Sequence, residues 1–200
     1  MSTLVLSHRL IFIRHGETDW NAEGRLQGQH DVPLNAKGRA QAVAAGKQAR
    51  AYISRLGLDD VRFIASPLGR TRATMELARE AMGLDPFTYE LEPRLMELSF
   101  GEWEGLIWPE VQQREPGAAR ARERDKWRFQ PPGGESYAML GERLRPWLAT
   151  VTGDTLIVSH GGVARVLMAM IGGVPVRDAP LADIHQGRVL VFENGRRAWL

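Results

Sequence analysis

The sequence predicts an α/β sandwich with a mostly parallel sheet, and two observations favour this fold class. Short apolar runs typical of buried strands occur at Leu10–Ile13, Val61–Ala65 and Thr155–Val158. Segments with helix-start and helix-stop signals lie between them. Strands that alternate with helices are characteristic of parallel sheets. The length of 200 residues suits one domain, which we place at residues 1–200.

The first half of the chain carries signals for two helices. A helix is predicted from Ala36 to about Leu56, with Asn35 as its N-cap. Ser66 resembles a second N-cap, with Pro67 at the first helical position. That helix is expected to run to about Met82, where the following glycine can end it.

The later elements continue the alternation. Tyr89–Leu91 is a candidate third strand. A helix is expected after the Thr155–Val158 strand, from about Gly162 to Ile171. Val189–Phe192 is a late strand, and Asn194-Gly195 is a turn after it.

Residues 106–132 interrupt this alternation. We interpret this segment as a helical, lid-like insertion that lies over one edge of the sheet. Arginines that recur along a helix most often form a solvated face. The segment contains Trp108, Arg114, Arg120, Arg122, Arg124, Lys126, Trp127 and Arg128.

Composition excludes several classes of protein. No cysteine is present, so disulfides and thiolate metal sites are excluded. The formal net charge is only +2, so no nucleic-acid partner is expected. Residues 1–8 are too short and polar for a signal peptide, and no apolar segment is long enough to span a membrane. We therefore expect a cytoplasmic protein without a membrane partner.

Two of the predicted strands end in the same way. Arg14-His15-Gly16 follows the first strand, and Ser159-His160-Gly161-Gly162 follows the Thr155–Val158 strand. Ligands of open parallel sheets bind outside the carboxyl ends of the strands, so both histidines are expected to face one crevice. A helix that begins near Gly162 would add its positive end, which favours an anion.

A third strand end would bring Arg70 to the same crevice. Arg14 and Arg70 could then hold one phosphoryl group, because the planar guanidinium matches phosphate oxygens. A metal centre is not expected, because the five histidines are scattered without the clustering that metal ligands need. His8, His30 and His185 have no comparable context and are interpreted as surface or structural residues.

Five motifs, in order, resemble the histidine phosphatase (phosphoglycerate mutase-like) superfamily. The resemblance spans Arg14 to Arg165, and it implies a three-layer α/β/α sandwich. The motifs are Arg14-His15-Gly16-Glu17-Thr18 with Trp20-Asn21 and Arg25-Leu26-Gln27-Gly28, Ser66-Pro67-Leu68-Gly69-Arg70-Thr71, Glu97 with Gly101-Glu102-Trp103-Glu104-Gly105, Pro132-Gly133-Gly134-Glu135-Ser136, and Ser159-His160-Gly161-Gly162.

The resemblance implies a role for each matching residue. His15 would be the nucleophile that takes the phosphoryl group. Arg14, Arg70 and His160 would hold its oxygens, and Asn21 would support the pocket. Glu97 would protonate the leaving oxygen, and its register within the family favours it over Glu102 and Glu104. Ser159 lacks the surroundings of a serine nucleophile.

The resemblance extends to the part of the site that would contact the rest of a substrate. Arg122, Lys126 and Arg165 are similar to residues of the domain that hydrolyses fructose 2,6-bisphosphate. Trp108 and Gly161 depart from that domain, which has Tyr and Gln there, although Gly161 still belongs to the predicted substrate-binding set. Similar segments occur in small bacterial phosphatases, including α-ribazole phosphatases.

Three functions remain open at this point. The leading hypothesis is a cofactor-independent and metal-independent phosphomonoesterase that acts on a small phosphorylated metabolite through His15. The second is a phosphoglycerate mutase, and the third is a phosphate-binding interaction protein without turnover. The expected partner is a small-molecule phosphate ester, and self-association into a homo-oligomer is left open.

Overall fold

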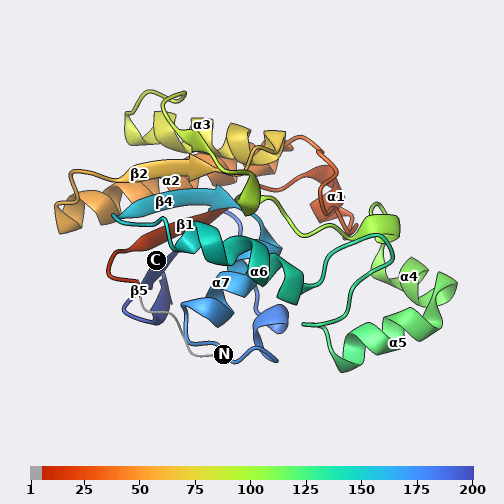
Figure 1. Ribbon diagram of the computed structural model, residues 1–200. Coiled ribbons are helices and arrows are strands. Elements are labelled where there is room, and N and C mark those ends of the chain that lie inside the picture. Colours follow the sequence, from red (N-terminus) through yellow and green to blue (C-terminus); the bar gives the residue numbers. More distant parts are fainter. Residues whose placement is uncertain (1–5) are drawn as a thin grey trace.

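A six-stranded sheet forms the centre of the computed structural model, which describes residues 6–200. The strand order is β3-β2-β4-β1-β5-β6, and the central part of the sheet is visible in Figure 1. The β1–β4, β2–β4 and β2–β3 pairs are parallel, whereas β5 runs antiparallel to both of its neighbours. The predicted mostly parallel α/β fold is confirmed. The strands are β1 (Leu10–Arg14), β2 (Arg62–Ala65), β3 (Glu90–Leu91), β4 (Thr155–Ser159), β5 (Val189–Glu193) and β6 (Arg196–Trp199).

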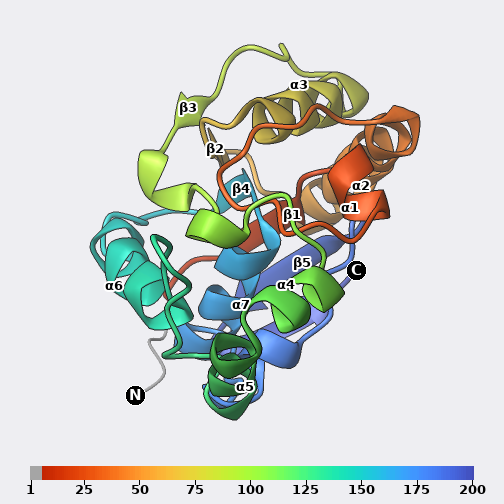
Figure 2. The same cartoon turned by 90° about the vertical axis from the view of Figure 1, so that its right-hand side faces the viewer.

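Helices cover both faces of this sheet and produce three layers. Helices α2 (Ala36–Leu56) and α3 (Gly69–Met82) cover one face, and α6 (Tyr137–Leu148) and α7 (Gly161–Met170) cover the other (Figures 1 and 2). Successive side chains of a strand point to opposite faces, so each central strand contributes to two cores.

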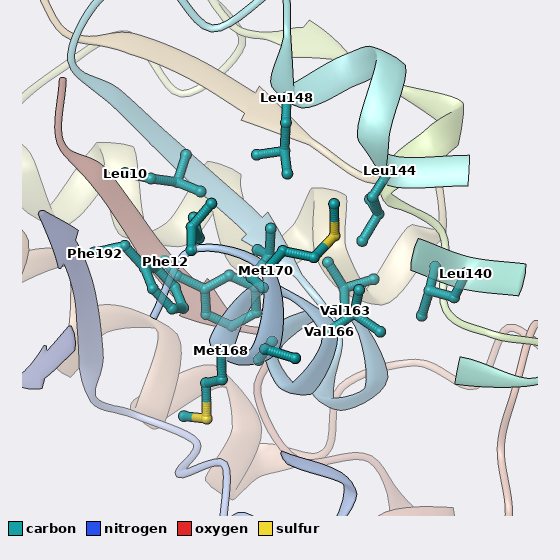
Figure 3. Packing of buried hydrophobic residues seen from close by; sticks show 14 of the residues in the cluster. Leu10, Phe12, Leu140, Leu144, Leu148, Val163, Val166, Met168, Met170 and Phe192 are labelled. Atoms are coloured by element: carbon teal, nitrogen blue, oxygen red, sulfur yellow. The ribbon is translucent and has the colours of Figure 1, made fainter. Parts of the chain in front are cut away.

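Strand β1 illustrates this division of the core. Leu10 and Phe12 belong to the cluster beneath α6 and α7, which Figure 3 shows from close by. Ile11 and Ile13 belong to the cluster beneath α2 and α3. All four side chains are fully buried, so β1 lies in the middle of the molecule and fixes the position of the residues that follow Arg14.

The helix boundaries confirm one predicted cap and correct another. The Asn35 side chain accepts a hydrogen bond from Gly38 N at 2.9 Å, as expected for the N-cap of α2. Helix α3 begins at Gly69, so the prediction of a Ser66 cap followed by Pro67 was wrong. Ser66 Oγ instead lies 2.8 Å from His160 Nε2, and Asp31 accepts the hydrogen bond of Gly69 N at 2.6 Å.

The 106–132 segment is helical, but it lies elsewhere than the sequence indicated. It contains α4 (Trp108–Arg114) and α5 (Pro116–Arg124). Figure 1 shows both helices beyond the carboxyl ends of the strands rather than over an edge of the sheet. Within residues 6–200, no helix is long and apolar enough to cross a membrane. The remaining short helices are α1 (Asp19–Ala22), η1 (Pro93–Leu95), η2 (Gly101–Trp103) and η3 (Ala179–Leu181).

Candidate active site

The carboxyl ends of β1 and β4 bring His15 and His160 together. His15 N donates to Ser159 O at 2.9 Å, and the two imidazole rings lie 5.2 Å apart between centroids. A pocket of about 120 Å³ opens beside His15. Seven of the ten predicted site residues line this pocket: Arg14, His15, Asn21, Arg70, Glu97, Gly161 and Arg165. His160 does not line it, but its ring packs beside that of His15.

The His15 ring has one nitrogen engaged and one available. Its Nδ1 lies 2.8 Å from Gly16 O, and a carbonyl can only accept, so we assign the proton to Nδ1. The lone pair is then on Nε2. Burial lowers the pKa of His15 well below its usual value, and the Arg70 and Arg14 charges lower it further. The ring is therefore a neutral imidazole, the form that can act as a nucleophile.

Arg14 and Arg70 are fixed by backbone carbonyls. Arg14 Nη1 donates to Ile184 O at 2.8 Å. Arg70 donates from Nη1 to His30 O and from Nη2 to Gly28 O, both at 2.7 Å. Burial lowers the pKa of Arg14 to about 10, so this guanidinium stays charged at neutral pH. Both cations are thus held in place in a largely dehydrated site.

Three buried side-chain nitrogens of this site lack a hydrogen-bond partner. Five buried side-chain nitrogens within residues 6–200 have no partner, and Arg14 Nε, Arg70 Nε and His160 Nδ1 are three of them. His160 Nε2 is engaged with Ser66 Oγ, which leaves Nδ1 as its free nitrogen. Unsatisfied buried donors cost free energy, and their concentration at one place indicates a ligand rich in acceptor oxygens.

Glu97 supplies the carboxylate of this pocket. Its two carboxylate oxygens accept from Leu98 N and from Gly162 N at the start of α7, each at 3.0 Å. A Cβ on Gly162 would lie 2.3 Å from Glu97 Oε1 and 2.2 Å from Leu98 Cδ2. Glycine is therefore required at 162 for the carboxylate to approach the helix this closely.

The two competing glutamates lie outside the pocket lining. One oxygen of Glu104 accepts from Gln29 N, Ser99 Oγ and Phe100 N, each at 3.1 Å, so this carboxylate is committed to the surrounding loops. Glu102 does not line the pocket. Ser159 Oγ donates to Leu95 O at 2.7 Å, which occupies the hydroxyl with the backbone.

Asn21 is held by two glutamines that the sequence reasoning did not single out. Its Oδ1 accepts from Gln186 Nε2 at 3.0 Å, and its Nδ2 donates to Gln27 Oε1 at 3.3 Å. Gln186 also donates to His15 O at 3.1 Å. Gln27 lies within a motif that carries the family resemblance and could have been found there, whereas nothing in the sequence marks Gln186.

A second cavity of about 310 Å³ contains the predicted substrate-contacting cations of the insertion. Arg122 and Lys126 line it, and the Arg122 guanidinium lies 4.9 Å from the Trp108 ring centroid. Within the described residues, neither cation forms an ion pair with a carboxylate. Burial, Arg122 and Arg165 lower the pKa of Lys126 to about 8.

Arg165 belongs to the His15 pocket, and its charge also acts on cations of the second cavity. It lines the His15 pocket, and its Nε donates to Ala182 O at 3.0 Å. Its charge lowers the pKa values of Arg14, Arg122 and Lys126, so Arg165 lies close enough to repel each of these three cations. One cation of the His15 pocket therefore acts electrostatically on the two predicted substrate-contacting cations of the insertion.

The remaining histidines make other contacts. His30 stacks on Trp20 at 5.0 Å between centroids, and His185 meets the edge of Trp199 at 4.9 Å. Trp103 and Trp147 are fully buried, as expected of packing residues. Residues 6–200 contain no group of three or more His, Cys, Asp or Glu residues placed to hold a metal ion.

This fold and this set of donors are those expected of an α/β protein that binds a phosphoryl group at a histidine. Residues 10–200 match the model of the histidine phosphatase superfamily (branch 1), and the chain belongs to this family. The resemblance drawn from the five motifs is thereby confirmed.

The similar proteins include one named as a mutase and others named as phosphatases. The chain is 37% identical over 172 residues to a probable phosphoglycerate mutase GpmB of Salmonella paratyphi C, which covers 84% of this chain and 76% of that protein. The structure is similar to a putative alpha-ribazole-5'-P phosphatase from Escherichia coli K-12, with a TM-score of 0.78, 25% identity and coverage of 98% and 95% of the two chains. It is also similar to a mycobacterial glucosyl-3-phosphoglycerate phosphatase in complex with VO3, with a TM-score of 0.77, 28% identity and coverage of 97% and 98%.

Proposed function

We propose that this protein is a phosphomonoesterase that acts on small phosphorylated metabolites through a phosphohistidine on His15. The observation that carries the proposal is a set of three buried nitrogens without a partner among the described residues, Arg14 Nε, Arg70 Nε and His160 Nδ1, beside a neutral imidazole. A phosphoryl group offers three oxygens to such donors. Phosphoryl transfer depends mainly on positioning and on electrostatic stabilisation, and this donor set supplies both.

The reaction proceeds in two balanced steps. In the first, the His15 Nε2 lone pair attacks phosphorus, the bond from phosphorus to the ester oxygen breaks, and protonated Glu97 gives its proton to the leaving oxygen. In the second, Glu97 takes a proton from water as the water oxygen attacks phosphorus. The nitrogen–phosphorus bond then breaks, and inorganic phosphate and neutral His15 are released.

Trapping the covalent intermediate tests this function. Purified enzyme is mixed with a ³²P-labelled phosphomonoester and denatured, and His15 is expected to carry acid-labile, base-stable label. His15→Ala should abolish both labelling and turnover, whereas His8→Ala, which lies before β1 and outside the pocket, should retain both. Full turnover in His15→Ala would refute the mechanism. Activity is expected to survive exhaustive chelation and to be inhibited by vanadate, which mimics five-coordinate phosphorus.

The cations of the second cavity support a narrower substrate class. Arg122 and Lys126 are partly buried and have no carboxylate partner within residues 6–200, so a second negative group of a substrate would satisfy them. We therefore favour small metabolites with two anionic groups, such as sugar bisphosphates or phosphoglycerates. The double variant Arg122→Ala with Lys126→Ala should raise KM for a bisphosphate and leave KM for p-nitrophenyl phosphate unchanged. If the ratio of kcat/KM between the two substrates is unchanged in the double variant, this cavity is not part of the substrate-binding site.

A mutase is the second candidate, and the 37% identity to a probable phosphoglycerate mutase favours it. A mutase would return the phosphoryl group from His15 to the product instead of passing it to water. Incubation with 3-phosphoglycerate and a catalytic amount of 2,3-bisphosphoglycerate distinguishes the two. A phosphatase releases inorganic phosphate, whereas a mutase forms 2-phosphoglycerate faster than it releases phosphate. Phosphate binding without either product would indicate the third hypothesis, an interaction protein.

A further inference from the structure

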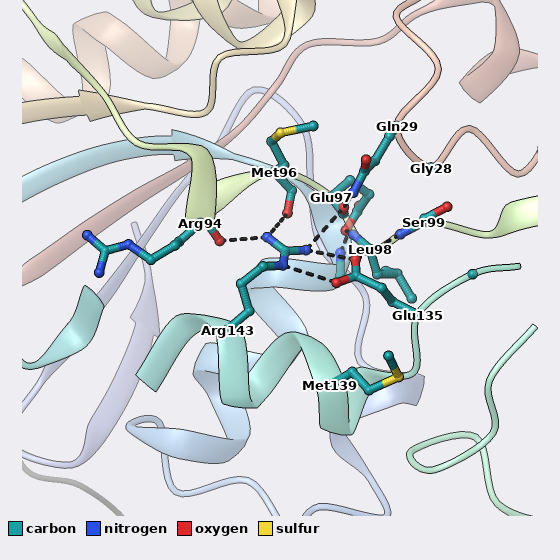
Figure 4. A network of polar contacts seen from close by, with 12 residues as sticks. Gly28, Gln29, Arg94, Met96, Glu97, Leu98, Ser99, Glu135, Met139 and Arg143 are labelled. Atoms are coloured by element: carbon teal, nitrogen blue, oxygen red, sulfur yellow. Dashed lines mark hydrogen bonds and ion pairs between the residues drawn. The ribbon is translucent and has the colours of Figure 1, made fainter. Parts of the chain in front are cut away.

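Arg143 of α6 takes part in a network of polar contacts around residues 94–99, the segment that contains Glu97 (Figure 4). Its Nη1 donates to Arg94 O at 2.7 Å and to Met96 O at 3.0 Å. Its Nη2 donates to Glu97 O at 3.3 Å. One guanidinium thus binds three carbonyls of residues 94–97, and its planar fork of five N–H donors still leaves donors for a further partner, which the three donors of a lysine would not.

Glu135 completes this network from the other side. Its two oxygens accept from Arg143 Nε at 3.1 Å and Nη2 at 2.9 Å. The same carboxylate accepts from Ser99 N at 3.1 Å, and Glu135 N donates to Ser99 O at 2.8 Å. Residues on both sides of Glu97 are therefore bound to one ion pair, whose two side chains are each 22% exposed.

The Gly133-Gly134 dipeptide before Glu135 brings the Arg143–Glu135 ion pair into contact with residues 94–99. A Cβ on Gly134 would lie 2.6 Å from Ser99 O, so the two backbones touch. Ser136 then caps α6 by accepting from Met139 N at 3.2 Å, and α6 carries Arg143 back over the segment. The Pro132–Ser136 motif and Arg143 therefore both contact the segment of residues 94–99.

Glu97 needs such support, because it lies in a loop. Helix η1 ends at Leu95 and η2 begins at Gly101, so residues 96–100 belong to no helix or strand. Apart from the network, Glu97 O is bound by Gln29 Nε2 at 3.0 Å. A misplacement of a reacting group by about 1 Å can cost 10²-fold in rate.

We propose that the Arg143–Glu135 ion pair is a positioning device that sets the location of the proton donor Glu97. The proposal rests on the proposed function. Neither side chain lines the pocket, so both act through the segment that they bind. The pair should affect proton transfer to the leaving group and leave phosphoryl binding intact, because Arg14, Arg70 and His160 are held by other contacts.

The test compares leaving groups in single-turnover phosphorylation of His15. Arg143→Gln should slow an alkyl phosphate about 10- to 100-fold and p-nitrophenyl phosphate less than threefold, because the second leaving group needs no proton. The dissociation constant of inorganic phosphate should change less than twofold. Arg143→Lys, which keeps the charge but loses the fork, should give an intermediate loss. Arg145→Gln is the matched control on the same helix, since this side chain is 44% exposed and, within residues 6–200, its only ion pair is with Glu142.

A double variant separates positioning from general destabilisation. In a Glu97→Gln background, Arg143→Gln should produce no further loss with the alkyl phosphate, because the proton donor is already absent. All assays are run well below the melting temperature of each variant, and Glu135→Gln replaces Arg143→Gln if that variant does not fold. Equal losses for both leaving groups, or a full additional loss in the double variant, would overturn the proposal. If wild-type protein turns over no phosphomonoester, the proposed function itself fails, and the positioning role fails with it.

Discussion

Glu97 is the residue whose predicted role is most open to a direct chemical test. Both of its carboxylate oxygens and its carbonyl oxygen are hydrogen bonded, so its position is fixed before a substrate arrives. General acid catalysis contributes about 10²–10⁴ in rate. We expect Glu97→Gln to lower the single-turnover rate at which an alkyl phosphate phosphorylates His15 by this factor. The rate with p-nitrophenyl phosphate should fall much less.

Glu102→Gln is the control for this measurement, because Glu102 does not line the pocket. It should leave both rates within twofold of wild type. If Glu97→Gln slowed the two substrates equally, the carboxylate would have a structural role, and another group would have to supply the proton.

The titration of Lys126 should make the pH dependence of kcat/KM differ between substrates. Its pKa of about 8 means that the ammonium is charged below this pH and neutral above it. For a bisphosphate, kcat/KM should therefore fall as pH rises through about 8, since a charge-assisted hydrogen bond contributes about 1.5–3 kcal/mol. The phosphate groups themselves are already ionised in this range.

Lys126→Arg is the decisive variant, because a guanidinium remains charged throughout this range. Its pH profile for the bisphosphate should be flat between pH 7 and about 9, and p-nitrophenyl phosphate should show no such decline with either protein. A decline that persists in Lys126→Arg would assign the titration to a different group.

The sequence predicted the site residues at the strand ends, but it did not predict the side chains that hold the site residues in place. His15 and His160 follow apolar strands, and the rule for parallel sheets was enough to place them together. Gln186 and Arg143 act through single side chains that cross from distant parts of the chain. No local pattern marks such a contact, because it is created only when the elements pack.

At the scale of elements, the close approach of α2 and α3 depends on one glycine. A Cβ on Gly46 would lie 2.4 Å from Ala78 O and 2.7 Å from Ala78 Cα, and both are backbone atoms that cannot move alone. Gly46→Ala should therefore lower the free energy of unfolding by about 1–3 kcal/mol through overpacking, despite the better helix propensity of alanine.

Gly117 of α5 provides the matched control, since a Cβ there would meet no atom within 4 Å. Gly117→Ala should raise the free energy of unfolding by up to about 1 kcal/mol. Urea denaturation measures both variants. A stabilised Gly46→Ala would mean that the two helices can separate slightly without loss.

The element boundaries show where local signals suffice and where they do not. Asn35 caps α2 with its own side chain, so the sequence was sufficient there. At α3 the cap is Asp31, a residue 38 positions away from Gly69, and Ser66 is engaged by His160 instead. Helix α6 was not predicted, although Ser136 and the apolar residues that follow at helical spacing mark its start.

At the scale of the whole molecule, the two buried histidines predict acid sensitivity. The pKa values of His15 and His160 are well below the usual value of about 6.5, mainly because of burial. In the unfolded chain both would bind protons near pH 6.5, and in the folded chain they do not. Stability is therefore present above pH 6.5 and is lost as pH falls below it, by up to about 1.4 kcal/mol per pH unit for each histidine.

Urea denaturation at pH 7 and pH 5, in buffers without phosphate, measures this loss. The double variant His15→Asn with His160→Asn should show a shallower dependence on pH over this interval, even if it is less stable at pH 7. An equal slope in both proteins would assign the acid sensitivity to carboxylates, whose usual pKa values lie lower.

The position of β4 between β2 and β1 also has a consequence for how the protein is made. During synthesis the ribosome releases β1 and β2 long before Thr155–Ser159, the strand that pairs with both of them. Until then, His15 lacks the Ser159 carbonyl that its backbone binds. Between the release of β1 and the release of β4, the nascent chain therefore cannot hold an assembled pocket, which forms only with the closure of the sheet.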